Sequence, residues 1–291
     1  MTQTNDISPT TEEVAAVANF VRQLDLETRG EDRFVGRAER EHPEWNREFG
    51  GLVLGQAAIA AGRTAPDPSL HSLQAYFLRG GRPDVPIEYR VERVRDGRTF
   101  TSRRVLASQE GVPICDTTMS FAHHEEGISH QEAMPEVPPP ESLRDARIEY
   151  PMEDGSTWPL GPVEWRVFEP FDKIAQPGEP ASVREWFRFR APLPDDPVLH
   201  AAALVFCSDM GSLNGVERRY GWEGMSHHAS ASLDHGFWLH RPARLEGWFL
   251  MVTDTPVAHA ARAWTQRQFY ARDGTHVATM VQEAVVRRER S

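Results

Sequence analysis

Residues 50–62 read GGLVLGQAAIAAG, a nearly continuous apolar stretch that is rich in glycine and alanine. After the Gly50-Gly51 pair, residues 52–62 have the composition of a helix that is buried on most of its sides. Small side chains also let neighbouring backbone come close to such a helix. The segment therefore predicts a central helix around which the rest of the fold is built.

A sheet is expected to follow this helix. Residues 87–91 alternate Ile, Tyr and Val with charged side chains, which is the pattern of a half-buried strand. Asp96-Gly97 predicts a turn into a strand over 99–108, and Glu110-Gly111 predicts a second turn into a strand over 114–121. The first half is thus expected to be a helix followed by an antiparallel meander.

An amphipathic helix is expected over residues 11–26, ahead of the buried one. Valines and a leucine recur there at helical spacing behind a Thr-Thr-Glu-Glu start, so we expect this helix to pack on the outside.

The second half repeats the theme of the first. Residues 124–162 are rich in proline and glycine and resemble a linker, after which a strand over 183–190 and an Ala-rich apolar helix over 199–213 are expected. Ser72-Leu73 matches Ser232-Leu233 at an offset of 232 − 72 = 160 residues, and the turn at Gly111 matches Gly274 at 274 − 111 = 163. Two copies of one unit are predicted.

The expected fold class is therefore α+β, with a helix and an antiparallel sheet in each unit, because a sheet with one apolar face is stabilised by wrapping a helix. The predicted division is an N-terminal unit over residues 1–124, a linker over 125–162 and a C-terminal unit over 163–291.

Composition excludes several classes of protein. The 291 residues are 40% hydrophobic and 26% charged, and 32 basic against 43 acidic side chains give a net charge of −11. Such a balance argues against wholesale binding to nucleic acid or to an anionic membrane. The longest apolar run, residues 201–207, is far shorter than the ~18 residues of a membrane-spanning helix.

The cell compartment is also predicted from sequence. Cys115 and Cys207 lie in apolar surroundings and are expected to be reduced core residues. Residues 1–13 lack the basic and apolar regions of a secretory signal, so a cytoplasmic location is expected.

Three segments carry candidate chemistry. Asp209 ends an apolar run, where it either caps the helix or takes part in a reaction. Ser232, Asp234 and His235 offer a hydroxyl, a carboxylate and an imidazole, but strand alternation puts His235 on the opposite face from the other two, so no ready triad is expected. Gln282 is the one polar member of an apolar strand face, either as a core glutamine with satisfied hydrogen bonds or as a catalytic amide.

No metal centre is expected from the histidines. Their spacings do not suit one ion, because adjacent histidines in a strand face opposite ways, as do His235 and His240. The histidines considered are His123, His124, His130, His227, His228, His235 and His240.

The chain resembles the type II acyl-CoA thioesterases in several separated motifs. In the first half these are residues 49–57 (FGGLVLGQA), 71–79 (HSLQAYFLR), 96–100 (DGRTF) and 103–105 (RRV). In the second half they are Ser208-Asp209, residues 231–235 (ASLDH) with Trp238 and His240, and Gln282-Glu283, in the order of the family and spanning about residues 34 to 288.

This resemblance implies a double hotdog fold, in which two tandem units each wrap an antiparallel sheet around a central helix. It also implies an acyl-CoA hydrolase that needs no cofactor or metal and releases a medium- or long-chain fatty acid and CoA. Carried over by motif, the catalytic residues are Asp209, Ser232 and Gln282. Asp209 would accept a proton from water, Ser232 and Gln282 would orient that water, and Asp234 would support them. The oxyanion donor would be a backbone N–H near a helix start.

Three residues depart from the family pattern. Gln74 replaces the usual second histidine of its segment, and Ala284 and Ala263 replace glycines. None of them removes a proposed catalytic group, although the two added methyl groups are expected to narrow the acyl tunnel or alter backbone approach.

Two other functions remain open on the sequence alone. One is a hotdog protein that binds acyl-CoA with little catalysis. The other is an enoyl-CoA hydratase, suggested by the spacing of Asp254 and His259, although neighbouring residues of that signature are missing. Whichever function holds, the exposed sheet edges of such a unit predict a homodimer or a higher homo-oligomer.

Overall fold

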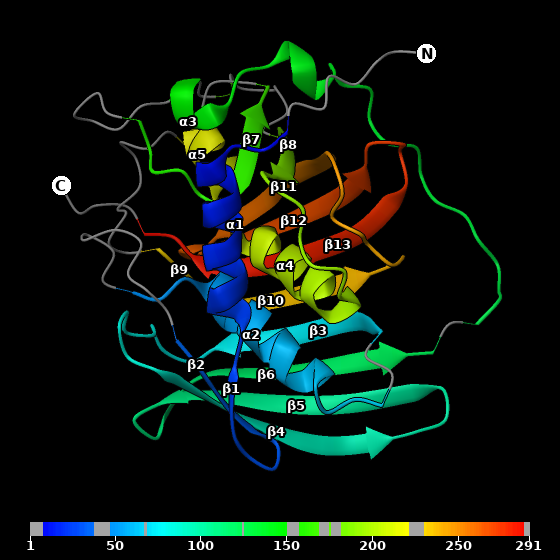
Figure 1. The fold of residues 1–291 in the computed structure, drawn as a ribbon. Coiled ribbons are helices and arrows are strands. Elements are labelled where there is room, and N and C mark those ends of the chain that lie inside the picture. Colours follow the sequence, from blue (N-terminus) through cyan, green and yellow to red (C-terminus); the bar gives the residue numbers. More distant parts are fainter. Residues whose placement is uncertain are drawn as a thin grey trace.

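Two helices, α2 (Gly50–Gly62) and α4 (Pro197–Asp209), pack against each other at the centre of the fold (Figure 1). The structure is a computed structural model that describes residues 8–37, 47–66, 69–123, 125–149, 157–168, 175, 182–220 and 230–287. Every residue of α2 after Gly50 is buried, which confirms the central helix predicted from its composition.

Glycines bring the backbones of these two helices together. A Cβ atom placed on Gly51 would lie 2.6 Å from the Phe206 carbonyl oxygen, and one on Gly55 would lie 3.3 Å from the Ala202 carbonyl oxygen. One on Gly62 would meet a Val198 methyl carbon at 2.6 Å. Contact positions rise along α2 as they fall along α4, so the helices are antiparallel. The start of α2 therefore lies at the end of α4.

The helix expected over 199–213 ends earlier than predicted, at Asp209. Gly211 has a φ of 58°, a left-handed conformation that glycine adopts without steric cost. Arg267 then donates hydrogen bonds to the carbonyl oxygens of Ser208, at 2.9 Å, and of Met210 and Gly211. These carbonyls would otherwise lack partners at the helix end, so a side chain distant in sequence decides where α4 stops.

The strands of the described chain form one antiparallel sheet on one side of α2 and α4 (Figure 1). Its order is β1-β2-β4-β5-β6-β3-β10-β13-β12-β11-β8-β7, with the short β9 paired to β13. The bounds are β1 (Glu27–Gly30), β2 (Arg33–Gly36), β3 (Leu70–Phe77), β4 (Ile87–Asp96), β5 (Phe100–Gln109), β6 (Val112–Ala122), β7 (Val163–Val167), β8 (Val183–Phe189), β9 (Ala231–Ser232), β10 (Asp234–Leu239), β11 (Phe249–His259), β12 (Arg262–Ala271) and β13 (His276–Val285).

This order is a palindrome about the junction of β3 with β10. Leu73 pairs there with Phe237, and both side chains are fully buried. The strand partner of Leu73 on its other side is Met119, and that of Phe237 is Met280. The two halves are thus related by a pseudo-two-fold axis that passes near the Leu73–Phe237 pair and between the crossing helices.

The structure corrects the register of the repeat. Leu73 corresponds to Phe237, at an offset of 237 − 73 = 164, rather than to Leu233. Arg103 and Arg267, the partners of the two methionines, share this offset, since 267 − 103 = 164. A shift of four residues keeps every side chain of a strand on the same face, so period-two patterning could not detect the error.

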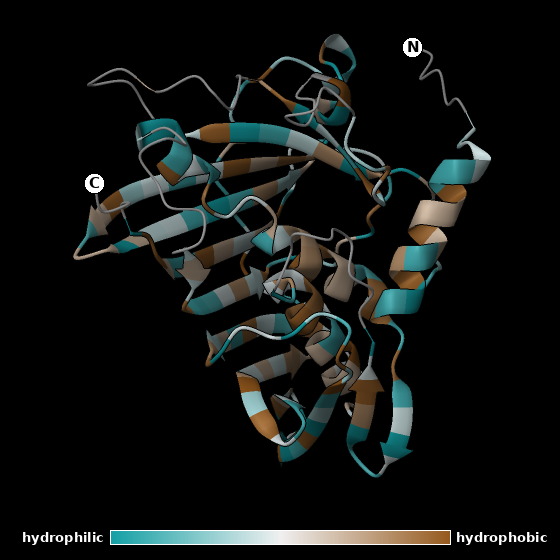
Figure 2. Ribbon diagram, turned by 90° about the vertical axis from the view of Figure 1, so that its left-hand side faces the viewer, coloured by the Kyte–Doolittle hydropathy of each residue, from teal (hydrophilic) through white to brown (hydrophobic). Residues whose placement is uncertain are grey.

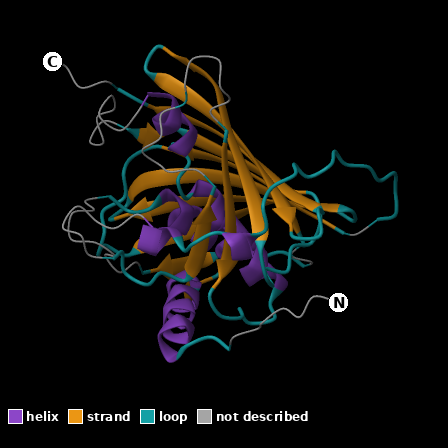
Figure 3. Cartoon of the chain, turned by 90° about the horizontal axis from the view of Figure 1, so that it is seen from above, coloured by secondary structure: helices purple, strands orange, loops and turns teal. Residues whose placement is uncertain are grey.

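A third layer covers the helix pair. Helix α1 (Thr11–Leu24) confirms the helix predicted behind the Thr-Thr-Glu-Glu start, and it begins with a capping box between Thr10 and Glu13. Its Phe20 ring contacts those of Phe189 and Phe206, with centroids 5.2 and 4.8 Å apart. Figures 2 and 3 show α1 on the far side of the molecule from the sheet, in the outer position expected for an amphipathic helix.

The segment after β6 passes the ends of the strands, on the right of Figure 1, and leads to the second half. It includes a 3₁₀ turn, η1 (Pro140–Ser142), and a short helix, α3 (Ala146–Glu149). The Trp186 indole N–H donates to the Pro138 carbonyl at 3.0 Å. Apolar side chains of this segment and of residue 168 cover an apolar outer face: Met134, Val137, Leu143 and Phe168 pack on Trp186, Trp248, Leu250, Val252 and Tyr270.

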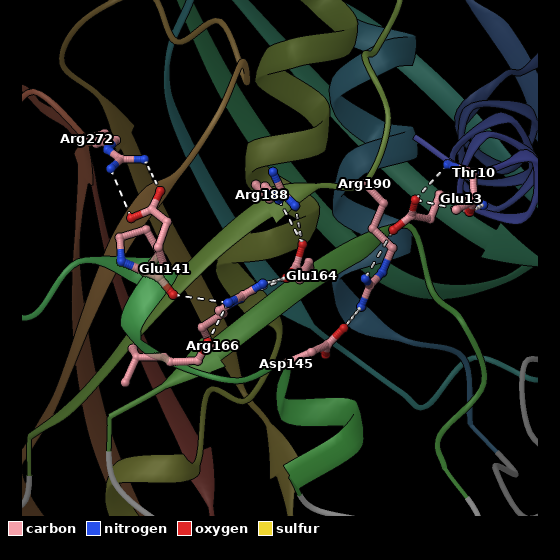
Figure 4. Close-up of polar contacts among 11 residues, drawn as sticks. Thr10, Glu13, Glu141, Asp145, Glu164, Arg166, Arg188, Arg190 and Arg272 are labelled. Atoms are coloured by element: carbon pink, nitrogen blue, oxygen red, sulfur yellow. Dashed lines mark hydrogen bonds and ion pairs between the residues drawn. The ribbon is translucent and has the colours of Figure 1, made fainter. Parts of the chain in front are cut away.

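Charged side chains fasten this segment, as Figure 4 shows. Arg166 donates to the Leu143 carbonyl at 2.5 Å and to Glu164, which also pairs with Arg188 at 2.8 Å. Arg190 bridges Asp145 of the segment, at 2.6 Å, and Glu13 of α1, at 3.6 Å. Arg272 binds Glu141 through two hydrogen bonds.

Both cysteines are free and buried, as expected. Burial raises the pKa of the Cys115 thiol to about 12 and also raises that of Cys207. Among the described helices, none is long and apolar enough to cross a membrane.

Replacing Gly51 by alanine should destabilise the protein by about 1–3 kcal/mol, because the new methyl group would overlap the Phe206 carbonyl oxygen. Urea unfolding should show the loss as a lower midpoint with little change in slope. Gly127 is the matched control, since a Cβ there meets nothing within 4 Å. Equal midpoints for the two variants would contradict the close helix contact.

Candidate active site

Asp209, the last residue of α4, lies at the start of α2. Its side chain is buried, and a Cβ atom on Gly50 would be 2.8 Å from its Oδ2 atom. The other carboxylate oxygen, Oδ1, has no hydrogen-bond partner among the described residues. A buried carboxylate with an unused oxygen is costly unless something compensates its charge. The antiparallel helix pair therefore brings an available base to the first residues of α2.

The start of α2 is suited to compensate this charge. Its N-cap residue, Phe49, makes no side-chain capping bond, and its carbonyl oxygen accepts from Leu52 and Val53. The N–H groups of the first helical residues have no acceptor within a helix, and the helix dipole is positive at this end. The start of α2 is thus an anion-binding end beside the Asp209 carboxylate.

Gln282 and Ser232 are in direct contact. The Gln282 amide nitrogen donates to the Ser232 hydroxyl oxygen at 2.7 Å and to that of Ser212 at 3.0 Å. Gln282 is 1% exposed, on a face of β13 that also buries Ala278, Met280 and Ala284, as the alternation predicted. The buried amide is therefore satisfied by two hydroxyl groups.

His235 lies between this pair and Asp209, a position that the sequence did not predict. Its Nδ1 atom is 2.6 Å from Gln282 Oε1 and 4.0 Å from Asp209 Oδ1, and its Nε2 atom is 2.9 Å from the Ser208 hydroxyl. Burial lowers the pKa of His235, so the imidazole is neutral. Because Gln282 Oε1 only accepts, Nδ1 carries the hydrogen of the neutral ring. The Ser208 hydroxyl has a single hydrogen, which Nε2 shares with the Val205 carbonyl oxygen, 2.7 Å from Ser208 Oγ.

The expectation that Ser232 and His235 face opposite ways was wrong. Strand β9 ends at Ser232 and β10 begins at Asp234, so Leu233 interrupts the alternation. Its N–H donates to the Glu283 carbonyl, and its carbonyl accepts from Phe77. Both Ser232 and His235 therefore reach Gln282, whereas Asp234 accepts from the Glu283 N–H at 2.8 Å.

The pseudo-two-fold axis does not create a second such site in the described chain. The helix contact of Gly55 with Ala202 gives an offset of 147, so Asp209 corresponds to Gly62. The methionine offset, 280 − 119 = 161, makes Phe121 the counterpart of Gln282. Helix α4 also starts with a side-chain cap from Asp196 and with Pro197, so its first N–H groups are not free as those of α2 are. Of these two symmetry-related positions in the described chain, only the one at Asp209 combines a base, an amide and an open helix start.

The histidines considered for a metal do not form one cluster in the described chain. His123, His130, His235 and His240 lie in the described part, and His124, His227 and His228 lie outside it. The described residues contain no group of three His, Cys, Asp or Glu side chains that could hold a metal ion.

Comparisons with known proteins match both halves of the chain. The acyl-CoA thioesterase N-terminal domain model matches residues 41–122, and the acyl-CoA thioesterase C-terminal domain model matches residues 132–286. Human acyl-coenzyme A thioesterase 8 is 33% identical over 91% of this chain and 87% of that protein.

Solved structures give the same result. An acyl-CoA thioesterase II from Mycobacterium marinum is 36% identical, with a TM-score of 0.77 over 92% of this chain and 98% of that one. An Alicyclobacillus acidocaldarius protein of unknown function, described as having a hot dog fold, has a TM-score of 0.76 at 19% identity, over 94% and 99% of the two chains.

Replacing His235 by glutamine should make stability less sensitive to acid. The folded-state pKa of His235 is lowered, so the unfolded state binds the proton more tightly and stability falls as pH drops below about 6.5. Between pH 7 and 5, the free energy of unfolding should fall less steeply for the variant, by up to about 1.4 kcal/mol per pH unit. The same substitution at the exposed His130 should leave the slope unchanged, and equal slopes in both variants would contradict a buried neutral imidazole.

Proposed function

The chain belongs to the type II acyl-CoA thioesterase family and has its double hotdog fold, and we propose on this basis that it hydrolyses acyl-CoA to a free fatty acid and CoA. One observation carries the proposal for the site: the Asp209 carboxylate lies at the uncapped start of α2. A base next to an anion-binding helix end is what the attack of water on a thioester carbonyl requires.

Asp209 acts as the base in the proposed reaction. It takes a proton from water while the water oxygen bonds to the thioester carbonyl carbon. The carbon–sulfur bond then breaks, and the leaving thiolate takes up the proton that Asp209 holds. One water is consumed, and the products are the carboxylic acid and CoA. The unpartnered Oδ1 atom supports this role, because it is free to accept the proton.

Ser232 and Gln282 orient the water. The Gln282 amide donates to the Ser232 oxygen, which leaves the Ser232 hydroxyl hydrogen free to donate elsewhere. His235 fixes the amide from the other side through its Nδ1–H. A hydroxyl whose direction is set by a buried amide holds a water at a defined angle of attack, and orientation of this kind lowers the barrier.

The first backbone N–H groups of α2, at Gly50 and Gly51, are the proposed oxyanion donors. They stand beside Asp209 because α2 and α4 are antiparallel, and a side chain at Gly50 would overlap Asp209 and the Phe77 ring, 2.8 and 2.9 Å away. Glycine therefore leaves room for the carbonyl oxygen of the substrate. Fixed donors of this kind stabilise the charge that develops in the transition state.

Medium- or long-chain acyl groups are the proposed substrates. Partly buried Phe49, Phe77 and Met210 surround the start of α2 and the end of α4, and give the site an apolar wall. Ala284 is the strand partner of both Ser232 and Ala263, so the two methyl groups that depart from the family pattern lie together beside the proposed water site. They support a narrowed path for the acyl chain.

The hydratase alternative gains no support from the fold. Asp254 and His259 lie along strand β11, where Asp254 accepts a hydrogen bond from Ser182 and His259 is exposed. Neither residue contacts Asp209 or the hydrogen-bonded group of Ser232, His235 and Gln282 in the described chain. Binding without catalysis is the alternative that the activity measurement below decides.

We also propose the division into units 1–124 and 163–291 with a linker over 125–162. The palindromic strand order supports it, since one half of the palindrome contains strands β1 to β6 and the other half strands β7 to β13. A cytoplasmic location is proposed on the two free, buried cysteines, which suit a reducing compartment.

Replacing Asp209 by asparagine should lower thiol release from acyl-CoA by about 10²–10⁴-fold, because the amide cannot accept the proton of the attacking water. The rates of wild type and variant are followed with a thiol-reactive chromophore over graded chain lengths. Asp254→Asn is the control, since this aspartate lies outside that hydrogen-bonded group, and it should retain the wild-type rate. Tight acyl-CoA binding without thiol release by the wild type would favour the binding protein instead.

We propose a homodimer or a higher homo-oligomer, because β1 and β7 are edge strands of the described sheet. Light scattering should then give a mass of 2 × 32.9 = 65.8 kDa or a higher multiple, and a value of 32.9 kDa at micromolar concentration would contradict the proposal.

A further inference from the structure

A cluster of buried charged side chains lies next to the proposed base, between the sheet and helix α5 (Asn214–Tyr220). It consists of Glu185 on β8, Arg267 on β12 and Glu217 on α5, with exposed fractions of 3%, 0% and 7%. None of the three belongs to the motifs that carry the family resemblance. Three ionisable groups buried together are rare in a protein core and have to balance one another.

The sheet register and α5 bring these groups together. Arg267 is the strand partner of Thr253, which in turn pairs with Val183. Glu185, two residues after Val183, lies on the same face of β8. From above, the Asn214 amide of α5 donates to Glu185 Oε1 at 3.4 Å. The cluster is therefore enclosed by two layers of the structure.

Hydrogen bonding leaves part of this cluster unmatched. Four buried side-chain atoms of this region lack a hydrogen-bond partner among the described residues: Glu185 Oε2, Glu217 Oε2, Thr253 Oγ1 and Arg267 Nε. No ion pair within 4.0 Å joins Arg267 to a carboxylate in the described chain. Arg267 instead uses its terminal nitrogens on the carbonyl oxygens at the end of α4. The positive charge of Arg267 is therefore balanced by carboxylates that are near it but do not form a direct ion pair with it.

Three carboxylates share that charge. Burial lowers the pKa of Arg267 to about 10, and Glu185, Asp209 and Glu217, in that order, act against this change. Burial also raises the pKa of Glu185 and of Glu217 to about 7. The net charge of the cluster therefore changes near neutral pH. Asp209 is close enough to Arg267 to interact with its charge.

We propose that Glu185 is a positioning residue for the hydrolysis described above: it serves as the counter-ion of Arg267, so that Asp209 at the end of α4 stays available as the base. The inference rests on the proposed function of Asp209. Arg267 has to remain a cation to hold the last turn of α4, and a cation buried beside the base competes with the proton of the attacking water. Glu185 removes that competition.

Other groups that face Asp209 do not replace Glu185. His235 on β10 is neutral because burial lowers its pKa, and Cys115 on β6 keeps its proton because burial raises its pKa to about 12. Glu217 is the remaining carboxylate, on the α5 side of the cluster. Among the carboxylates that act on Arg267, Asp209 comes second after Glu185. Without the Glu185 charge, Asp209 therefore becomes the main counter-charge of Arg267.

Glu185→Gln keeps the size of the side chain and its acceptor for Asn214 while removing its charge. We expect kcat for thiol release at pH 8.5 to fall by about ten-fold or more, with KM within about two-fold, since only the reacting carboxylate is affected. At pH 6, where Glu185 of the wild type is itself largely protonated, the two rates should agree within about three-fold. A residue that served the fold alone would not produce a ratio that grows with pH.

Asp96→Asn is the matched control. Arg103, the pseudo-symmetric counterpart of Arg267, is also fully buried, and it donates to the Thr64 carbonyl at 2.9 Å and to Asp96 at 2.5 Å. This pair holds the other end of α2, about 20 Å from its start at 1.5 Å per residue. The control should keep the wild-type kcat at both pH values.

The outcomes separate the two proposals. Thiol release by the wild type together with an unchanged kcat and pH profile in Glu185→Gln would overturn the role of Glu185 alone. A wild type that releases no thiol would overturn the proposed function and this inference with it. Should Glu185→Gln fail to fold, Glu217→Gln tests the same cluster: a smaller loss of kcat at pH 8.5 supports the inference, and no loss overturns it.

Discussion

The close antiparallel contact of α2 and α4 is the constraint on which the rest of the structure depends. Glycines at the interface let the two backbones approach until Cβ atoms would overlap carbonyl oxygens. This contact fixes the axis that relates the halves of the chain, and it places the end of one helix at the start of the other. A carboxylate and a helix start meet at Asp209 for this reason, and each helix contributes one of them.

The same constraint would create two equivalent sites, and the sequence makes only one of them reactive. At the end of α4 stands a carboxylate, whereas at the end of α2 stands Gly62, packed against Val198. The start of α2 is uncapped, whereas that of α4 is closed by Asp196 and Pro197. A repeated fold thus retains its symmetry in the backbone and loses it in the few side chains that carry charge or donate hydrogen bonds.

The single reactive site requires a buried charge in the second half of the chain, the Arg267 guanidinium. Arg267 ends α4 by binding three carbonyl groups, and its cation has to be balanced in an interior where an unpaired charge is strongly unfavourable. In the first half, Arg103 has a direct partner in the half-exposed Asp96. In the second half the balancing carboxylates are buried, and one of the nearby carboxylates is the proposed base. Structure and proposed chemistry are therefore coupled through a single guanidinium group.

The sequence by itself determined the buried helix over 52–62, the turns at Asp96-Gly97 and Glu110-Gly111, the repeat, and the polar Gln282 on an apolar face, because each depends on local composition or periodicity. Only the tertiary structure decided the register of the repeat and the end of α4 at Asp209, since a four-residue shift preserves strand faces and Arg267 acts from 56 to 59 residues away in sequence. It also decided the place of His235, because a strand break at Leu233 depends on pairing with β13 and β3. Local patterns fix which residues are buried, and long-range pairing fixes which of the buried residues meet.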